Sequence, residues 1–173
     1  MTNKFTRNSE YLNNLLEDSI NEGRECVAGG LIINNEKKIF VQKRSHDRKL
    51  FPGCWDIAGG HVDPGETIYD ALEREINEET GWRLNKIINL IYQFDWETSH
   101  NNEIIKKREF DFLVTVEGDL RNPVIEENKF SEYRWVGDND IEILKENRPA
   151  GDYAIYEMVK KSLKYMEETY ERK

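Results

Sequence analysis

The stretch that decides the fold is Gly60–Trp82, which reads GHVDPGETIYDALEREINEETGW. It contains the densest run of acidic residues in the chain. Its aliphatic residues recur at helical spacing, which predicts an amphipathic helix with one face on a core. The residues of that face are Ile68, Ala71, Leu72 and Ile76.

Three glutamates of the same helix are predicted to share this face. At 3.6 residues per turn, Glu75, Glu78 and Glu79 project into one sector, whereas Arg74 points the other way. Carboxylates aimed at a core are unfavourable unless positive charge meets them. A divalent metal ion is the cation that this arrangement favours.

Signals for a turn, a helix start and a helix stop surround this pattern. Asp63–Glu66 has the composition of a Pro-Gly turn, and Thr67 is suited to be the N-cap. Gly81 stands where a glycine commonly ends a helix, and Trp82 can pack on the last turn. The Gly59–Gly60 pair upstream predicts a sharp turn that exposes backbone carbonyls.

Composition and charge limit the classes of function. The chain has 173 residues, 38% hydrophobic and 34% charged, which predicts one globular domain over residues 1–173. A formal net charge of −9 works against nucleic acid or an anionic membrane as partner. Cys26 and Cys54 lie far apart without a C-x-x-C motif, which favours free thiols in a reducing cytoplasm. No apolar segment reaches the length of a membrane span, and the N-terminus lacks a secretory pattern.

The remaining patterns predict an α+β chain with a mixed, largely antiparallel sheet between helices. Residues 1–23 form a helical extension, suited to packing or to contact in a homodimer. The expected elements are a helix at 9–21, strands at 24–33, 38–44 and 55–58, a hairpin of 86–98 with 103–117, a strand at 131–136, a short helix at 138–146 and a closing helix at 152–170.

Aromatic residues alternate along the first strand of the predicted hairpin. Ile88 and Leu90 precede Tyr92, Phe94 and Trp96 at period two. This pattern is typical of residues in a core. Contact with a substrate base or another apolar group is the alternative for the three aromatic side chains.

The fixed residues of Gly60–Trp82 resemble the signature of the Nudix hydrolase family, which includes MutT-like pyrophosphohydrolases. That signature is G-x5-E-x7-R-E-U-x-E-E-x-G-U, where U is a bulky apolar residue, and every fixed position is met. Trp82 stands where an aliphatic residue is more usual. The order of the flanking strands extends the resemblance to about residues 24–165, and it implies an α/β/α sandwich.

The resemblance implies Mg²⁺-dependent hydrolysis of the pyrophosphate linkage in a nucleoside diphosphate joined to another group. Nucleoside triphosphates, including oxidised forms, are one candidate substrate, and ADP-ribose or other nucleotide sugars are the alternative. An isomerase of the isopentenyl-diphosphate type is disfavoured, because Ala58 and Gly59 stand where its cysteine would be needed. A non-catalytic nucleotide-binding module is disfavoured because such domains usually lose the signature glutamates.

The resemblance also implies a metal site. Mg²⁺ is the expected cofactor and Mn²⁺ a possible substitute, since both prefer oxygen ligands. Glu66 is expected as an outer ligand, with a structural ion pair as the alternative. The complete expected ligand set is the carbonyl of Gly59 and the carboxylates of Glu66, Glu75, Glu78 and Glu79.

Catalytic and binding roles follow from the same resemblance. Glu75 and Glu78 are expected to be catalytic, and Arg74 to orient a glutamate by a salt bridge. Arg44 lies where related enzymes place a substrate-binding arginine. Some family members take their base from a loop, for which the candidates are Glu126, Glu127 and Glu132. The expected partner is a small nucleoside-diphosphate-type molecule, with a homodimer as a possible assembly.

Overall fold

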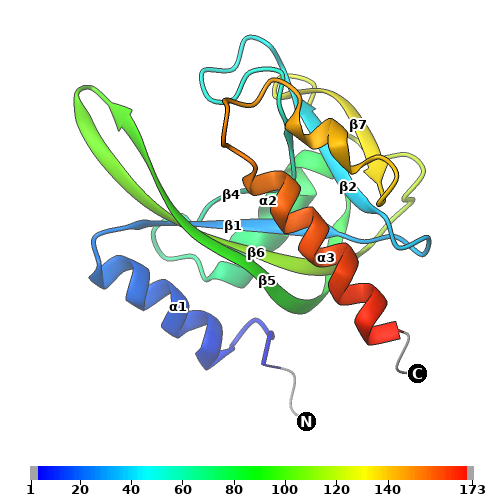
Figure 1. The fold of residues 1–173 in the computed structure, drawn as a ribbon. Helices are drawn as coiled ribbons and strands as arrows, with labels where there is room; N and C mark the ends of the chain where they lie inside the picture. Colours follow the sequence, from blue (N-terminus) through cyan, green and yellow to red (C-terminus); the bar gives the residue numbers. More distant parts are fainter. Residues whose placement is uncertain (1–3, 171–173) are drawn as a thin grey trace.

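The structure is a computed structural model that describes residues 4–170, so the ends of the predicted 1–173 domain lie outside the described residues. Its elements follow the predicted order closely (Figure 1). They are α1 (Glu10–Asn21), β1 (Glu25–Ile32), β2 (Ile39–Arg44), β3 (Trp55–Asp56), β4 (Ala58–His61), α2 (Ile68–Thr80), β5 (Arg83–His100), β6 (Glu103–Glu117), β7 (Phe130–Val136), the 3-10 helix η1 (Ile141–Lys145) and α3 (Ala154–Tyr170).

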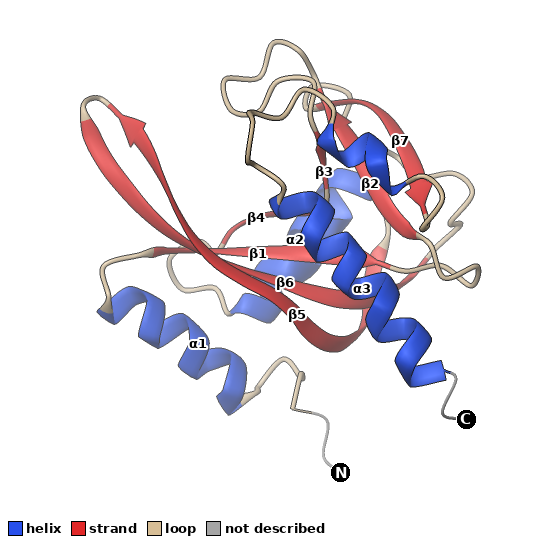
Figure 2. Cartoon of the chain, in the orientation of Figure 1, coloured by secondary structure: helices blue, strands red, loops and turns tan. Residues whose placement is uncertain are grey.

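The strands form two sheets (Figure 2). The larger has the order β4-β1-β6-β5, in which β1 and β6 are parallel and the other neighbours antiparallel. The smaller has the order β3-β2-β7 and is antiparallel. The α+β class with a mixed, largely antiparallel sheet is therefore confirmed, although the strands divide between two sheets.

Helices cover both faces of the larger sheet. In Figure 1, α3 lies in front of it and α2 behind it, while α1 packs beside α2. The α2 side is filled by aliphatic and aromatic side chains that include Leu72, Ile76 and Phe112, and the α3 side by others that include Leu113 and Met158. Each such side chain contributes about 1.5–3 kcal/mol when fully buried. The layers confirm the predicted helix-sheet-helix arrangement.

Both ends of α2 form as the sequence predicts. The side chain of Thr67 accepts a hydrogen bond from the amide of Asp70, and Gly81 ends the helix with a φ of 74°. The buried ring of Trp82 packs on Phe40, with ring centroids 4.9 Å apart. The helix that carries the acidic residues is thus anchored at its start, along its apolar face and at its end.

The Gly59–Gly60 pair is not a turn, so that prediction is wrong. Both glycines lie in β4, where Gly59 pairs with Gly29 of β1. A Cβ atom at position 60 would overlap the carboxylate of Glu75, so that side chain would have to shift if glycine were replaced. The expected strand at 55–58 is split in two at Ile57, and the short helix expected at 138–146 is the 3-10 helix η1.

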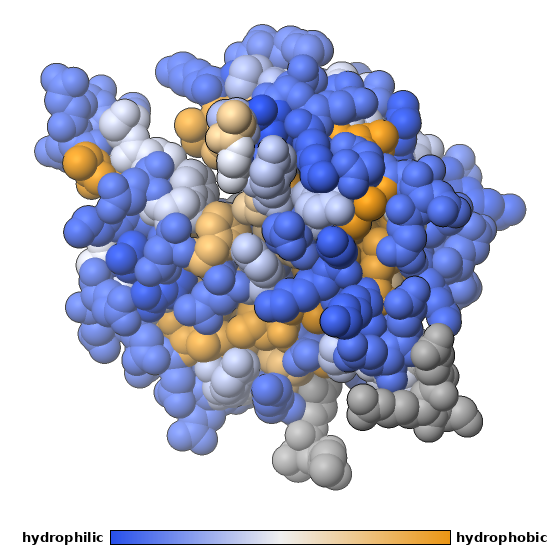
Figure 3. Space-filling model, viewed as in Figure 1, coloured by the Kyte–Doolittle hydropathy of each residue, from blue (hydrophilic) through white to orange (hydrophobic). Residues whose placement is uncertain are grey.

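The hairpin of β5 and β6 is longer than predicted and arches away from the body (Figure 1). Three register shifts occur in β5 before Tyr92, so the predicted alternation of inward and outward side chains fails in that part of the strand. The buried residues of β5 are Leu84, Ile87 and Ile91. Figure 3 shows the projecting end as mainly hydrophilic.

Two further sequence expectations concern cysteines and membrane spans. Cys26 and Cys54 are buried, free thiols, as predicted. Burial raises the pKa of Cys26 to about 12, so this thiol stays protonated. No helix within residues 4–170 is long and apolar enough to cross a bilayer.

Candidate active site

A cavity of about 890 Å³ opens where α2 meets the edge strand β4. Its walls bring together residues that are far apart in the sequence. They include acidic side chains of α2, aromatic side chains of β5, and arginine and lysine side chains from β2 and from loops. Members of these groups are Glu75, Glu79, Arg44, Lys129, Phe94 and Trp96.

Glu79 is the most deeply placed acid of the helix, with 3% of its surface exposed. Its Oε2 accepts hydrogen bonds from the amide of Gly59 at 3.1 Å and from Nε2 of Gln42 at 2.8 Å. The ammonium group of Lys129 lies 3.9 Å from Oε1. Burial raises the pKa of Glu79 to about 8. A cation placed beside this carboxylate would restore its charge.

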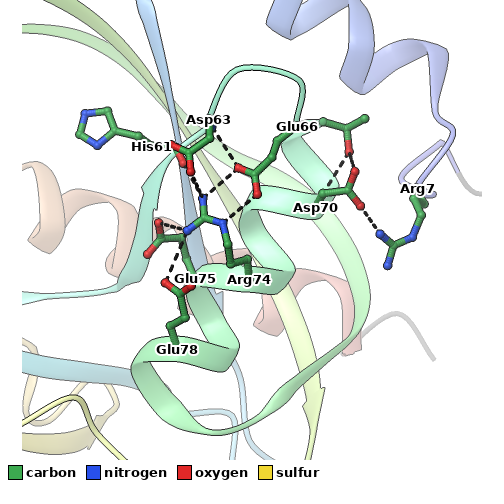
Figure 4. Close-up of polar contacts among 9 residues, drawn as sticks. Arg7, His61, Asp63, Glu66, Asp70, Arg74, Glu75 and Glu78 are labelled. Atoms are coloured by element: carbon green, nitrogen blue, oxygen red, sulfur yellow. Dashed lines mark hydrogen bonds and ion pairs between the residues drawn. The ribbon is translucent and has the colours of Figure 1, made fainter.

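Arg74 turns back across the acidic face, so the prediction that it points away is wrong (Figure 4). Its Nε lies 2.7 Å from Glu66, and its Nη1 lies 2.6 Å from Glu75 and 3.5 Å from Glu78. Its Nη2 donates to the carbonyl of His61 at 3.0 Å. The Cα–Cβ bond leaves the helix on the other side, but the long side chain reaches back. This geometry matches a role in orienting a glutamate.

Glu66 is fixed by two interactions outside the cavity. Both its carboxylate oxygens accept hydrogen bonds from Arg74, at 2.7 and 2.9 Å. Oε2 also accepts from the amide of Asp63 at 3.0 Å, which closes the loop before α2 (Figure 4). The Arg74 hydrogen bond is the main reason that the pKa of Glu66 is lowered. The geometry therefore matches the structural ion-pair alternative.

The three glutamates of α2 do not share one environment. Glu75 and Glu79 are buried, with 8% and 3% exposed, and both line the cavity. Glu78 keeps 49% of its side chain exposed and lies outside the cavity lining. At 3.6 residues per turn, Glu78 falls at the outer edge of the predicted sector, so its side chain faces solvent.

Arg44 lies in the cavity wall, where a substrate-binding role would place it. Its Nη1 is 3.3 Å from the carboxylate of Asp56, and its Nε donates to the carbonyl of Leu50 at 2.9 Å. The guanidinium is thus held between β3 and the loop after β2.

The three loop glutamates lie in different places. Glu126 forms an ion pair of 3.0 Å with Lys129, which in turn approaches Glu79. Glu127 is exposed, and Glu132 is exposed on β7 opposite Lys43. Only Glu126 is brought near the acidic helix.

Several charged groups that line this cavity or lie beside it were not singled out by the sequence analysis. Glu109 lines the cavity, and Asp111 is buried directly behind it on β6. Arg148, in the segment between η1 and α3, also lines the cavity. The sequence did carry a signal for Glu109 and Asp111. These two acids alternate with the apolar residues Phe110 and Phe112, so they fall on the other face of the strand. The three aromatic side chains of β5 line the cavity as well, which matches the substrate-contact alternative.

The expected ligands are carboxylates and the backbone carbonyl of Gly59. All of these are oxygen donors, which hard divalent cations prefer. Two acidic side chains packed together at Glu75 and Glu79 also call for positive charge. Within residues 4–170, no three His, Cys, Asp or Glu side chains are grouped as a metal site requires. Arg74 draws Glu75 and Glu78 toward itself, so ligation by all three requires these side chains to turn inward.

Comparisons with known proteins agree with this fold. The sequence model of the NUDIX domain matches residues 24–159. A nucleoside triphosphatase, NudI, of Escherichia coli strain UMN026 is 33% identical over 113 residues, which cover 64% of this chain and 80% of that protein. An uncharacterised Nudix hydrolase of Nostoc sp. is 29% identical over 130 residues, covering 72% and 71%.

A solved structure supports the fold alone. The MutT protein of Methanosarcina mazei superposes with a TM-score of 0.61 at 21% identity, covering 83% of this chain and 95% of that one. Fold, site and sequence together define a pyrophosphohydrolase. The chain belongs to the Nudix hydrolase family, whose members generally need a divalent metal and act on small nucleotide-like substrates.

Proposed function

We propose that this enzyme is a Mg²⁺-dependent pyrophosphohydrolase of nucleoside triphosphates, including oxidised forms, with Mn²⁺ as a substitute. The observation that carries the proposal is the single cavity that joins the buried carboxylates of Glu75 and Glu79 to Lys129 and Arg44. Such a site can hold a metal ion and a chain of phosphates together. A relative named a nucleoside triphosphatase supports this substrate class. Hydrolysis of ADP-ribose or nucleotide sugars is the alternative.

The metal would be held by the carbonyl of Gly59 and by Glu75, Glu78 and Glu79, with Glu66 as an outer ligand. When bound, Mg²⁺ would neutralise phosphate charge and lower the pKa of a coordinated water. This assignment requires Glu78 to rotate from its exposed position.

The protein's own residues bind, orient and accept a proton. Lys129 and Arg44 face the cavity and would bind phosphate oxygens. Arg74 lies 2.6 Å from Glu75 and so fixes the direction of its carboxylate. We assign the proton-accepting role to Glu75, since it lines the cavity. Glu78 and the loop residues Glu126, Glu127 and Glu132 are the other candidates.

The test is phosphate release from a panel of nucleotides, coupled to inorganic pyrophosphatase, with Mg²⁺, Mn²⁺ or EDTA. We expect turnover of at least one nucleoside triphosphate with metal and none with EDTA. Glu75→Gln and Glu79→Gln should lower kcat by roughly 100-fold or more. The matched control is Glu17→Gln, an exposed glutamate on α1. Turnover of nucleotide sugars alone would establish the alternative, and no turnover at all would refute the proposal.

The domain is also proposed to include the N-terminal helix. Leu12 of α1 is buried in the same core as α2. Arg7 pairs with Asp70 of α2 (Figure 4) and also with Glu73. The homodimer, the cytoplasmic location and the exclusion of nucleic acid and membrane stay predictions.

A further inference from the structure

Strand register places two glycines between the acidic helix and a buried acid. Gly59 of β4 pairs with Gly29 of β1, and Gly29 is next to Asp111 of β6, which neighbours Tyr92 of β5. Both glycines line the cavity, and we call the row from Gly59 to Asp111 the trough; the side chains of Asp111 and Ile57 lie over Gly29. With strands about 4.8 Å apart, the trough runs roughly 10 Å from Gly59 to Asp111. Its near end lies against Glu79, which accepts the Gly59 amide.

Asp111 at the far end is a buried acid without ordinary partners. It is 0% exposed, and neither carboxyl oxygen receives a hydrogen bond from an N–H or hydroxyl group within residues 4–170. A Cβ atom on Gly29 would overlap Oδ1, so the carboxyl leans over a residue that lines the cavity. Burial, and then the neighbouring Glu109, raise the pKa of Asp111 well above its usual range. Both effects favour the protonated form of Asp111.

Glu109 lies two residues earlier on the same side of β6 and lines the cavity beside Phe94. Its carboxylate accepts a side-chain hydrogen bond from the carboxyl group of Asp111. Arg148 is the cation that acts on it, but that guanidinium donates to the carbonyl of Trp55 at 2.7 Å and pairs with Asp152 at 3.3 Å. Glu109 also receives side-chain hydrogen bonds from Asp111 and Trp96, and a carboxylate with two such partners keeps further lone pairs for a ligand in the cavity.

The surroundings of Glu109 suit a flat ring rather than phosphate. Phe94 is its cross-strand neighbour, and Trp96 follows on the same side of β5. The ring of Phe51 reaches over from the loop after β2, with its centroid 6.4 Å from that of Trp96. Aromatic surfaces stack on nucleobases, whereas a carboxylate repels phosphate. This end of the cavity therefore matches the non-phosphate part of a substrate.

We propose that Glu109, positioned by Asp111, binds the N–H-bearing edge of the substrate's base. The inference rests on the proposed function and specifies the class of nucleotide. Guanine has two adjacent N–H donors on its Watson–Crick edge, N1–H and N2–H, which match the two oxygens of one carboxylate. The carbonyl O2 of cytosine, uracil or thymine would face the same carboxylate unfavourably. The site is therefore assigned to guanine nucleotides.

Burial raises the pKa of Glu109 to about 7, so the test compares GTP with ITP, which differ only in the 2-amino group, under Mg²⁺ at pH 8.5 in the wild-type enzyme. We expect kcat/KM for GTP to exceed that for ITP by roughly 10- to 100-fold, as for a hydrogen bond to a charged acceptor. GMP should likewise inhibit more strongly than IMP by a similar factor. Equal turnover of GTP and ITP, or a preference for a pyrimidine nucleotide, would overturn the proposal. Absence of all nucleotide turnover would instead refute the proposed function.

Variants separate the two acids. Glu109→Gln should bring the GTP/ITP ratio close to one. Glu97→Gln, at the exposed rim of the same cavity, is the matched control and should leave the ratio unchanged. Asp111→Asn keeps a donor toward Glu109 and should preserve the preference, whereas Asp111→Leu should lose it. A full preference in Glu109→Gln would contradict the assignment, and the wild-type inhibition by GMP and IMP decides the matter if a variant does not fold.

Discussion

Replacing Glu79 by glutamine should stabilise the metal-free protein at alkaline pH. Burial raises the pKa of Glu79 from 4.5 to about 8, so the folded protein resists its ionisation. A raised folded pKa means that stability is complete below about pH 4.5 and declines as the pH approaches 8. Glutamine carries no charge, and its carbonyl oxygen can still accept from Gly59 and Gln42.

The size of the effect follows from the pKa difference. Each pH unit between the two pKa values costs about 1.4 kcal/mol of unfolding free energy. Between pH 6 and pH 8, ionisation of Glu79 should therefore lower the unfolding free energy of the wild type by about 2–3 kcal/mol. Glu79→Gln should not show this loss. Loss of the attraction to Lys129, 3.9 Å away, reduces this gain somewhat.

The assay is urea unfolding followed by tryptophan fluorescence, in EDTA, from pH 6 to pH 8.5. The chain has a sequence pI of about 5.0, so lower pH is avoided to keep it soluble. Glu17→Gln removes an exposed glutamate and should follow the wild-type pH dependence. Equal pH slopes for the wild type and Glu79→Gln would refute the argument that Glu79 is destabilised by burial.

Three further predictions test the acidic helix. Saturating Mg²⁺ at about 100 times its Kd should raise the unfolding free energy of the wild type by about 2.7 kcal/mol, measured by urea unfolding, but much less for Glu79→Gln. Gly60→Ala should lower kcat at least about 10-fold, because the new Cβ displaces the carboxylate of Glu75, whereas Gly137→Ala meets only ordinary contacts and should leave kcat unchanged. Thr67→Ala removes the N-cap of α2 and should cost about 1 kcal/mol of unfolding free energy while kcat stays near the wild-type value; a loss below 0.3 kcal/mol, roughly the error of the method, would contradict the capping role.

Local patterns predicted the acidic helix well because its determinants are local. Thr67, Gly81 and the aliphatic face act within a few residues of one another, so spacing alone places them. The family signature then identified the carboxylates. The positions of most flanking strands along the chain also follow from their patterns of hydrophobic residues.

Features that depend on contacts between distant segments were not predicted. The neighbourhood of Glu109 and Asp111 arises from pairing of β6 with β1, which lie far apart in the sequence. The prediction of which side chains of β5 share a face was wrong before Tyr92, because three register shifts interrupt the alternation there. Arg74 was misplaced because helical spacing fixes the Cα–Cβ direction but not the end of a long side chain.

The parallel pairing of β1 and β6 fixes which face of the sheet each side chain of β6 occupies. A slip of β6 by one residue would turn Asp111 and Glu109 to the α2 side and bring Phe110 and Phe112 to the trough. The acid-lined end would then become apolar, and the two acids would enter the core that supports α2. One strand register thus sets both the polarity of the cavity wall and the apolar support beneath the helix that carries the glutamates.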